Sequence, residues 1–448
     1  MTNIFVDFNK QIGKIKPMHG VGQPPLLGIS TECFKYLKEA NIPYSRLHDV
    51  GGWHGGNMFV DIPNIFRDFE ADETNPDNYD FTFTDILIAG LIENGCEPVY
   101  RLGVTIENFH IYRAYRIFPP KDMEKWARIC EHIIRHYNEG WANGFKYNIQ
   151  YWEIWNEPDN DQDGQKNAMW RGTAEDYYNL YRITAKHLKK QFGDSIKIGG
   201  YGSCGFYAVH TDQLLNEKAF GNIEPVPIEE LQRRCYYYMD FFEGFLDMVS
   251  KENLPLDFFT YHSYGNVPET VKMQEYAERR LAEMGRPDTE IHLNEWNTHF
   301  HMFDRGTSAA SAGAAAMMCA MQNTKMELMC YYDARIGVDV FSGLFNPLTL
   351  GKFCTYYSFK AFGNLFALGV QTSCISNSGE IYAVAATDGS KKALLISNLG
   401  EATDVVTNLT DDMRVFVIDE EHFMEETNIS PINFSISKNQ VIYIESRT

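Results

Sequence analysis

Two of the Asn-Glu pairs in this sequence of 448 residues combine the residue types that acid–base chemistry requires with a place at the end of a strand-like run. Asn156-Glu157 ends a run typical of a β-strand, and Asn294-Glu295 ends another. Hydrolysis of a glycosidic bond needs such a pair of carboxyl groups, because one protonates the leaving oxygen while the other attacks the anomeric carbon or activates water. The alternative is two surface glutamates at helix starts, where carboxylates are also favoured.

The elements around these pairs must bring them together, and the chain alternates strand-like and helix-like stretches from about residue 18 to 367. The expected strands are 18–22, 44–50, 97–103, 149–156, 195–201, 257–263, 289–295 and 327–332. The expected helices are 31–40, 84–94, 121–139, 174–191, 232–252, 269–284, 307–323 and 355–366. Eight strand–helix repeats predict an α/β fold of the (β/α)8 TIM-barrel type, with a doubly wound open sheet as the rival. In a barrel, Glu157 on the fourth strand and Glu295 on the seventh would face each other across the C-terminal mouth.

After Leu368 the helical periodicity ends, and short alternating runs separated by turn residues follow. These runs are 382–386, 393–397, 405–408, 415–418, 432–436 and 441–444. They predict a C-terminal antiparallel β-sandwich, which the alternating run Ile4–Phe8 can join as a further strand. The predicted divisions are 1–15 for the N-terminal strand of the sandwich, 16–368 for the catalytic barrel and 369–448 for the accessory sandwich.

The 60 acidic residues outnumber the 40 Lys+Arg and give a formal net charge of −20. This balance argues against nucleic acid or an anionic membrane as the partner, because both bind basic patches. The N-terminus has no secretory signal pattern, and none of the nine cysteines forms a Cys-x-x-Cys motif, so we expect a cytoplasmic protein with free thiols. The Ala-rich stretch 307–322 falls short of a bilayer span and is expected to be a buried helix. The sequence leaves assembly into a homo-oligomer open.

Several motifs of the barrel resemble those of glycoside hydrolase family 39, the β-xylosidase and α-L-iduronidase family within the retaining (β/α)8 hydrolases. They are Tyr79-Asp-Phe81, Gly95-Cys-Glu-Pro98, Trp152-Glu-Ile-Trp-Asn-Glu-Pro158, Phe259-Thr-Tyr-His-Ser-Tyr264 and Asn294-Glu295. The appended sandwich with its N-terminal strand also fits that family. The resemblance implies that Glu157 is the general acid/base, that Glu295 is the nucleophile, and that the anomeric configuration is retained.

Further side chains are expected around the two carboxyl groups. Arg46 and His48 share one face of the second strand by period-two alternation, so both could point into the barrel. We expect Arg46 to hold Glu295 as a carboxylate, and an ion pair with Glu153 is the alternative. His48 is a candidate contact to the sugar. By the resemblance, Asn156 donates to the sugar hydroxyl next to the anomeric carbon.

The sixth and eighth strands end in residues that bear on the substrate. By the resemblance, His262 and Tyr264 contact the sugar and orient the nucleophile. Tyr332 is the candidate sugar contact on the eighth strand, near the position where β-xylosidases of the family have a Trp as the floor of the sugar site. This departure puts the xylose assignment in doubt. Arg335 either reads a carboxylate or pairs with a neighbouring aspartate such as Asp333 at the surface.

The segment that follows the second strand also departs from the family, which usually has His-Gly in this neighbourhood. Here Asp49 follows the histidine, where it binds a sugar hydroxyl or caps the turn at Gly51-Gly52. Trp53 belongs to the long loop 51–79. The aromatic residues of this loop form either a wall for the sugar or a small hydrophobic core beneath the loop.

These observations together predict a retaining glycoside hydrolase that needs no metal or other cofactor and removes a terminal sugar from an oligosaccharide or glycoside. A β-xylosidase is the first expectation, and an α-L-arabinofuranosidase or another glycosidase of the same family is the second. Two alternatives come from other classes. One is a non-catalytic carbohydrate-binding protein on a barrel scaffold, and the other is a metal-dependent barrel hydrolase with His19, His299 and His301 as ligands. The sugar, the linkage and the choice between exo and endo action stay open.

Overall fold

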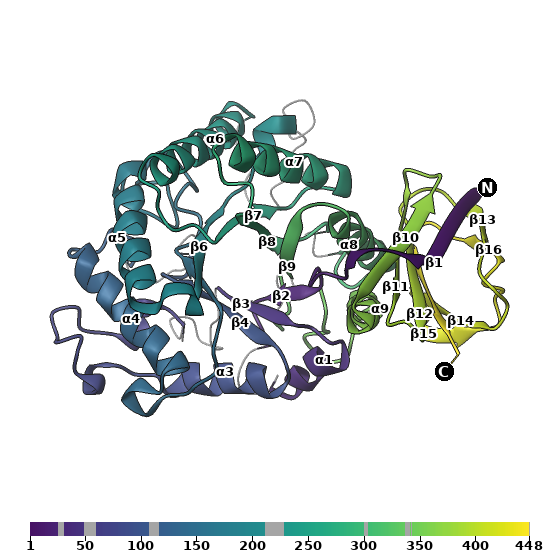
Figure 1. Ribbon diagram of the computed structural model, residues 1–448, viewed down its shortest axis with the longest axis horizontal. Helices are drawn as coiled ribbons and strands as arrows, with labels where there is room; N and C mark the ends of the chain where they lie inside the picture. The colour runs from purple at the N-terminus through teal and green to yellow at the C-terminus, as the bar shows by residue number, and fades with distance from the viewer. Residues whose placement is uncertain are drawn as a thin grey trace.

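The computed structural model describes residues 1–25, 31–48, 60–106, 116–210, 228–299, 303–336, 341 and 343–447. Eight parallel strands form a closed barrel with helices around it, and a curled, mostly antiparallel sheet lies at one side of the barrel (Figure 1). The prediction of a (β/α)8 barrel with a C-terminal β domain that includes the N-terminal strand is therefore confirmed.

The barrel strands pair in sequence order, and the last closes on the first. They are β2 (Gly20–Gly22), β3 (Tyr44–Leu47), β4 (Glu97–Leu102), β5 (Tyr151–Ile154), β6 (Lys197–Ser203), β7 (Phe258–Ser263), β8 (Glu290–Trp296) and β9 (Met326–Tyr331). Almost every residue of these strands is buried, since side chains fill the interior and helices cover the outside. Each predicted barrel strand overlaps an observed one, and most of the differences lie at the ends.

The helices of the barrel are α1 (Phe34–Glu39), α3 (Thr82–Glu93), α4 (Met123–Asn138), α5 (Ala174–Phe192), α6 (Ile228–Lys251), α7 (Val267–Glu283), α8 (Ser308–Gln322) and α9 (Cys354–Leu368). A short helix that the sequence did not predict, α2 (Ile62–Ile65), precedes α3. Short 3-10 turns are η1 (Thr31–Cys33), η2 (Pro76–Asn78), η3 (Trp141–Asn143), η4 (Gly193–Ser195) and η5 (Tyr207–His210). Capping boxes fix where α5 and α7 begin, with Thr173 and Asp176 at one and Asn266 and Glu269 at the other.

The second sheet has nine strands in the order β15-β14-β17-β12-β11-β10-β1-β13-β16. They are β1 (Thr2–Lys14), β10 (Val370–Ser376), β11 (Ile381–Thr387), β12 (Lys392–Asn398), β13 (Thr403–Thr407), β14 (Met413–Ile418), β15 (Phe423–Thr427), β16 (Asn433–Ile436) and β17 (Gln440–Ser446). The N-terminal strand β1 runs antiparallel to β10 and parallel to β13. Two strands, β10 and β15, were not predicted, because their polar residues hide the apolar alternation.

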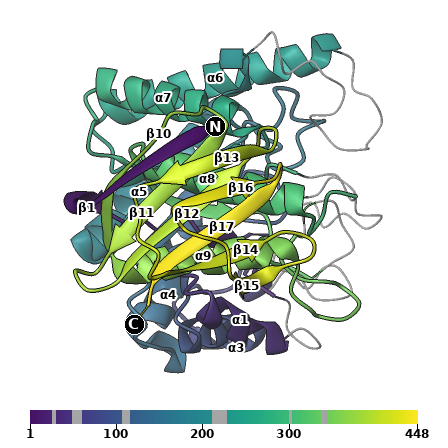
Figure 2. The same cartoon turned by 90° about the vertical axis from the view of Figure 1, so that its right-hand side faces the viewer.

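The Ala-rich helix α8 and its neighbour α9 lie between the barrel and the second sheet (Figure 1), and they are behind the sheet in the view of Figure 2. Small side chains let the sheet approach closely, and the hydroxyl of Ser397 on β12 donates to the carbonyl of Ala312 at 2.7 Å. The prediction of a buried helix in this stretch is confirmed. Within the part of the chain that the structure describes, none of the helices has both the length and the apolar character needed to cross a bilayer.

Candidate active site

Glu157 lies just after β5 and is fixed in place by its backbone. It adopts a left-handed conformation with φ of 44°, which non-glycine residues rarely adopt. Its N–H donates to the carbonyl oxygens of Tyr201 and Gly202 on β6, at 3.1 and 3.0 Å. These two contacts offset the cost of the unusual backbone conformation and aim the side chain toward the barrel axis.

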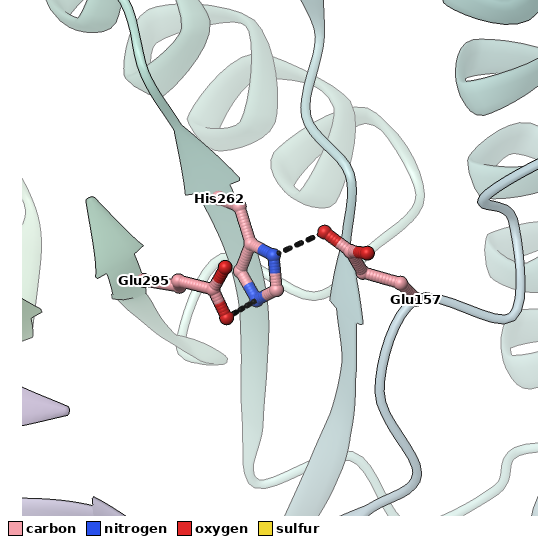
Figure 3. Close-up of side chains that lie close together, drawn as sticks. All are labelled: Glu157, His262 and Glu295. Carbon is pink, nitrogen blue, oxygen red and sulfur yellow. Dashed lines mark hydrogen bonds and ion pairs between the residues drawn. The ribbon is translucent and has the colours of Figure 1, made fainter. Parts of the chain in front are cut away.

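Glu157 and Glu295 point toward each other, and the imidazole of His262 lies between them (Figure 3). His262 Nδ1 is 2.8 Å from Glu157 Oε1, and its Nε2 is 3.8 Å from Glu295 Oε2. One carboxylate oxygen of each glutamate and one ring nitrogen of the histidine all lie within 4.8 Å of one another. The structure therefore brings together three residues that come from the ends of β5, β7 and β8.

Both oxygens of Glu295 are held by donors. The hydroxyl of Tyr264 donates to Oε1 at 2.5 Å, and Arg46 Nη1 donates to Oε2 at 3.1 Å. The same guanidinium donates from Nε to Glu153 Oε2 at 2.8 Å and from Nη2 to Asn156 Oδ1. Arg46 therefore makes both contacts that the sequence offered as alternatives, one to Glu295 and one to Glu153.

Glu153 is completely buried inside the barrel and acts as the second counter-charge of Arg46. It also accepts hydrogen bonds from Thr260 Oγ1 at 2.7 Å and from Asn294 Nδ2 at 2.6 Å. A buried charge is tolerated when it is paired and hydrogen-bonded in this way. Glu153 thus fixes the guanidinium of Arg46, which in turn donates to Glu295.

The two facing carboxyl groups and the histidine titrate as one coupled group, because they are buried and close together. Burial raises the pKa of Glu295, with a further contribution from the charge of Glu157, and together they outweigh the opposing effects of His262, Arg46 and Tyr264. Burial also acts to raise the pKa of Glu157, but the hydrogen bond and charge of His262 outweigh it, so this pKa is lowered. Burial opposes a charged imidazole, yet the two carboxylates outweigh burial and raise the pKa of His262.

These directions favour a protonated imidazole at His262 and an ionised carboxyl group at Glu157. With the proton on the imidazole, Glu157 is a carboxylate, which is the reverse of what a general acid requires. Transfer of the proton along the 2.8 Å contact turns Glu157 into a carboxylic acid without any change in the net charge of the group. The contact between His262 and Glu157 therefore allows the proton that a general acid needs to pass to Glu157.

Two of the other predicted sugar contacts lie at the same end of the barrel. His48 is buried at the end of β3, where its Nδ1 accepts from Arg101 Nε at 3.2 Å. Burial and then the charge of Arg101 hold its pKa well below the ordinary value, so His48 is neutral. Tyr332 accepts a hydrogen bond from Gln23 Nε2 at 2.5 Å, and its ring lies 6.4 Å from the ring of Tyr264.

The remaining predicted residues fall in different places. Asp49 and Trp53 lie outside the described residues, so their predicted roles stay predictions. Arg335 lies 3.5 Å from Asp333, which agrees with the predicted pairing of these two residues, but Asp333 is fully buried. The side chain of Arg335 is 26% exposed, so only one end of the pair reaches the surface, where the sequence had placed both residues.

Several contacts in the site were missed by the sequence reasoning. Asn160 Nδ2 donates to Glu157 Oε2 at 3.0 Å, Gln23 supports Tyr332, and Phe341 lies 5.2 Å from the ring of Tyr264. Their positions depend on loops and tertiary contacts, which leave no pattern in the sequence. Arg101 was a detectable signal, because a charged residue within a buried strand needs a partner, and it has one in Asp61 at 2.7 Å.

A metal ion could be held only by residues with suitable donors close together. Over the described ranges, such a group consists of Glu157, His262 and Glu295 themselves. The guanidinium of Arg46, 3.1 Å from Glu295, opposes a cation there. His19 and His299 take no part in this group, and His301 lies outside the described residues.

The sequence matches the family model described as "Glycosyl hydrolases family 39" over residues 4–333. A β-xylosidase of Caldicellulosiruptor saccharolyticus is 27% identical over 323 residues, which is 66% of this chain and 56% of that protein. A β-xylosidase of Geobacillus stearothermophilus is 22% identical over 276 residues, which is 55% of this chain and 46% of that protein. The chain thus spans about half the length of the curated relatives it matches.

Solved structures share the fold over the whole chain. A glucosidase from Croceicoccus marinus has a TM-score of 0.76 at 18% identity, with 100% of this chain and 99% of that chain covered. A family 39 β-xylosidase from Caulobacter crescentus has a TM-score of 0.68 at 16% identity, with both chains covered to 100%. At these identities the likeness concerns the fold alone. The family match, which extends over more than half of the chain, confirms the resemblance seen in the sequence, and the chain belongs to glycosyl hydrolase family 39.

Proposed function

We propose that the protein is a retaining glycoside hydrolase that releases a terminal sugar, with a β-xylosidase as the leading candidate. The observation that carries this proposal is the convergence of the Glu157 and Glu295 carboxyl groups, which have oxygens within 4.8 Å of each other. Retaining enzymes hold their two carboxyl groups about 5–5.5 Å apart, whereas inverting enzymes need about 6.5–9.5 Å to admit a water. The names of the two curated relatives support xylose as the sugar.

In the first step, a carboxylate oxygen of Glu295 attacks the anomeric carbon and forms a covalent glycosyl ester. Glu157 gives its proton to the glycosidic oxygen, and the bond between that oxygen and the anomeric carbon breaks. Arg46 and Tyr264 hold Glu295 in place and favour its charged form before the attack. Their donors are fixed by the barrel, so little reorganisation is needed at the moment of reaction.

In the second step, water attacks the anomeric carbon from the side that the leaving group vacated. Glu157, now a carboxylate, takes a proton from that water, and Glu295 is released. The contact between His262 and Glu157 suits this exchange, because the pair can hold the proton on either partner. Two inversions at the anomeric carbon leave its configuration unchanged.

A panel of nitrophenyl glycosides tests the activity and the sugar. We expect the fastest release from the β-D-xyloside, and faster release from an arabinofuranoside would favour the second candidate. Activity should persist in the presence of a chelator. If sugars bind but none is cleaved, the carbohydrate-binding alternative replaces the proposal.

Substitution of each carboxyl group tests the two roles. Glu157→Gln should slow glycosides with poor leaving groups far more than activated aryl glycosides, because the latter need little protonation. Glu295→Ala should regain turnover with azide and give a glycosyl azide of inverted configuration. Glu290→Gln is the matched control, since Glu290 lies at the opposite end of the same strand and pairs with Lys197. If Glu157→Gln lowers the rate equally for substrates with poor and good leaving groups, Glu157 is not the general acid.

A further inference from the structure

The carboxyl group of Glu157 has a second partner besides His262. Asn160 Nδ2 donates to Glu157 Oε2 at 3.0 Å, while His262 Nδ1 faces Oε1 at 2.8 Å. Each oxygen of the carboxyl group therefore has one donor. Since the side chain of Glu157 is only 13% exposed, these donors replace most of the water that would otherwise solvate the charge.

Asn160 is itself anchored by a neighbouring helix. Its N–H closes a turn to the carbonyl of Glu157 at 3.1 Å. Its own carbonyl accepts two hydrogen bonds from Arg234 on α6, from Nε at 3.2 Å and from Nη2 at 2.9 Å. A guanidinium that makes two N–H contacts to one carbonyl fixes the peptide more firmly than a single contact does.

We propose that Asn160, anchored by Arg234, is a positioning residue that holds Glu157 Oε2 and favours the carboxylate form of Glu157. This inference rests on the proposed function of Glu157 as the acid/base. The reaction needs that carboxyl group in both forms, protonated in the first step and ionised in the second. A donor on Oε2 stabilises the ionised form, and it fixes the orientation of the group while the proton passes to and from the substrate.

Charged and titratable groups face Glu157 from every element packed against it, and their effects must be separated from the effect of Asn160. They are Arg46 on β3, Asp159 after β5, Cys204 after β6, Tyr207 in η5, Arg234 on α6, His262 and Tyr264 at the end of β7, and Glu295 on β8. Asn160→Ala leaves all of these groups in the protein, and besides the donor to Glu157 it removes a long contact of 3.8 Å from Asn160 Nδ2 to the neutral thiol of Cys204. Because burial raises the pKa of Cys204 and keeps its thiol neutral, a shift in the ionisation of Glu157 in this variant is due to the donor lost from Oε2.

The first experiment measures kcat/KM against pH for Asn160→Ala and for the unchanged protein, with a substrate that has a poor leaving group. Because the lost donor favoured the carboxylate, the pKa of Glu157 should rise, and the alkaline limb should move up by about one pH unit, a tenfold change in ionisation. A substrate with a good leaving group should show a smaller change in kcat. If the alkaline limb stays in place and the rate falls equally for both substrates, the inference is wrong and Asn160 has only a structural role.

Variants of the helix test the anchor. Arg234→Lys keeps the charge but loses the paired contacts, so its alkaline limb should move in the same direction by a smaller amount. Arg233→Ala is the matched control, because Arg233 precedes Arg234 on α6 and donates to the side chain of Asp161 at 3.3 Å, whereas Arg234 donates to the carbonyl of Asn160. If Arg233→Ala moves the limb as far as Arg234→Lys does, the anchor has no specific effect and the inference fails.

A measurement without turnover separates this inference from the proposed function. NMR titration of the full chain with carbon-13-labelled glutamate side chains follows the Glu157 carboxyl directly, and Glu157→Gln identifies its signal. Asn160→Ala should raise the observed pKa by about one unit. A raised pKa in a protein that cleaves no glycoside would uphold the role of Asn160 and refute the proposed function. An unchanged pKa in an active protein would do the opposite.

Discussion

Tyr264→Phe removes one hydroxyl from the site and keeps the ring. That hydroxyl donates to Glu295 Oε1 at 2.5 Å, and burial raises its own pKa well above the ordinary value, so it stays protonated and acts as a donor. The ring packs against Tyr332 and Phe341, with centroid distances of 6.4 and 5.2 Å, and these contacts can persist in the variant. The substitution therefore tests a single hydrogen bond to the nucleophile.

The size of the effect follows from the charge of the acceptor. A hydrogen bond to a charged group contributes about 1.5–3 kcal/mol, and a shift of one pKa unit corresponds to about 1.4 kcal/mol. The donor favours the carboxylate, so its loss should raise the pKa of Glu295 by about one to two units. Glu295 must be ionised to attack, and activity is lost as the pH falls through its pKa. The acidic limb of kcat/KM should therefore move to higher pH, with a fall in kcat/KM of about one to two orders of magnitude.

The assay is the pH profile of kcat/KM for an activated aryl glycoside, in which protonation of the leaving group matters least. Tyr276→Phe is the matched control, because its hydroxyl also donates to a carboxylate, Glu243 at 2.7 Å, but on the outer helices α7 and α6. The control should leave both limbs in place. An acidic limb that stays in place or moves to lower pH in Tyr264→Phe would refute the reasoning.

Three further predictions concern the base of the site and its pH response. Arg46→Met should lower the free energy of unfolding by about 3–5 kcal/mol, because it leaves the fully buried Glu153 without its counter-charge; a loss below about 1 kcal/mol in denaturant titration would contradict this. Gly202→Ala should lower kcat/KM at least about tenfold while circular dichroism shows a folded protein. Gly202 has φ of 61°, and a Cβ there would lie 3.1 Å from both Arg46 Nη2 and His262 Nε2. An unchanged kcat/KM would show that the site has room for a Cβ at this position. Burial raises the pKa of Asp159 to about 7, so its contribution to stability is present below its unfolded pKa and is lost as the pH rises through about 7. Asp159→Asn removes this titration, so as the pH rises to about 7 the melting temperature of the variant should fall less than that of the unchanged protein. Equal falls in melting temperature for the two proteins would contradict the raised pKa of Asp159.

The sequence was sufficient for the fold of the barrel and for which residues lie at its mouth. Alternation of strands and helices predicts the closed parallel topology, and that topology places the C-terminal ends of all strands on one side. Period-two alternation also predicted that Arg46 faces inward, and its contacts to Glu153 and Glu295 show this. Strands β10 and β15 were missed because neither has an apolar alternation of its own: β10 is mostly polar, and β15 is an edge strand with largely exposed side chains.

Distances within the site depend on the register in which neighbouring strands pair. In the pairing of β7 with β8, a register shift after Tyr261 places His262 beside Glu295, and nothing in either strand's composition signals that shift. Asn160 is three residues from Glu157, but its anchor on Arg234 is 74 residues away in the chain. Such contacts form only when the helices and loops pack.

The residue types and their places at the strand ends thus belong to the sequence, because local pattern and topology decide on which side of the barrel a residue stands. The tertiary structure alone decided that one imidazole lies between the two carboxyl groups and that one guanidinium serves both Glu295 and Glu153. The physical reason is that hydrogen bonds and ionisation depend on separations of a few tenths of an ångström, and these are set by packing across the whole barrel.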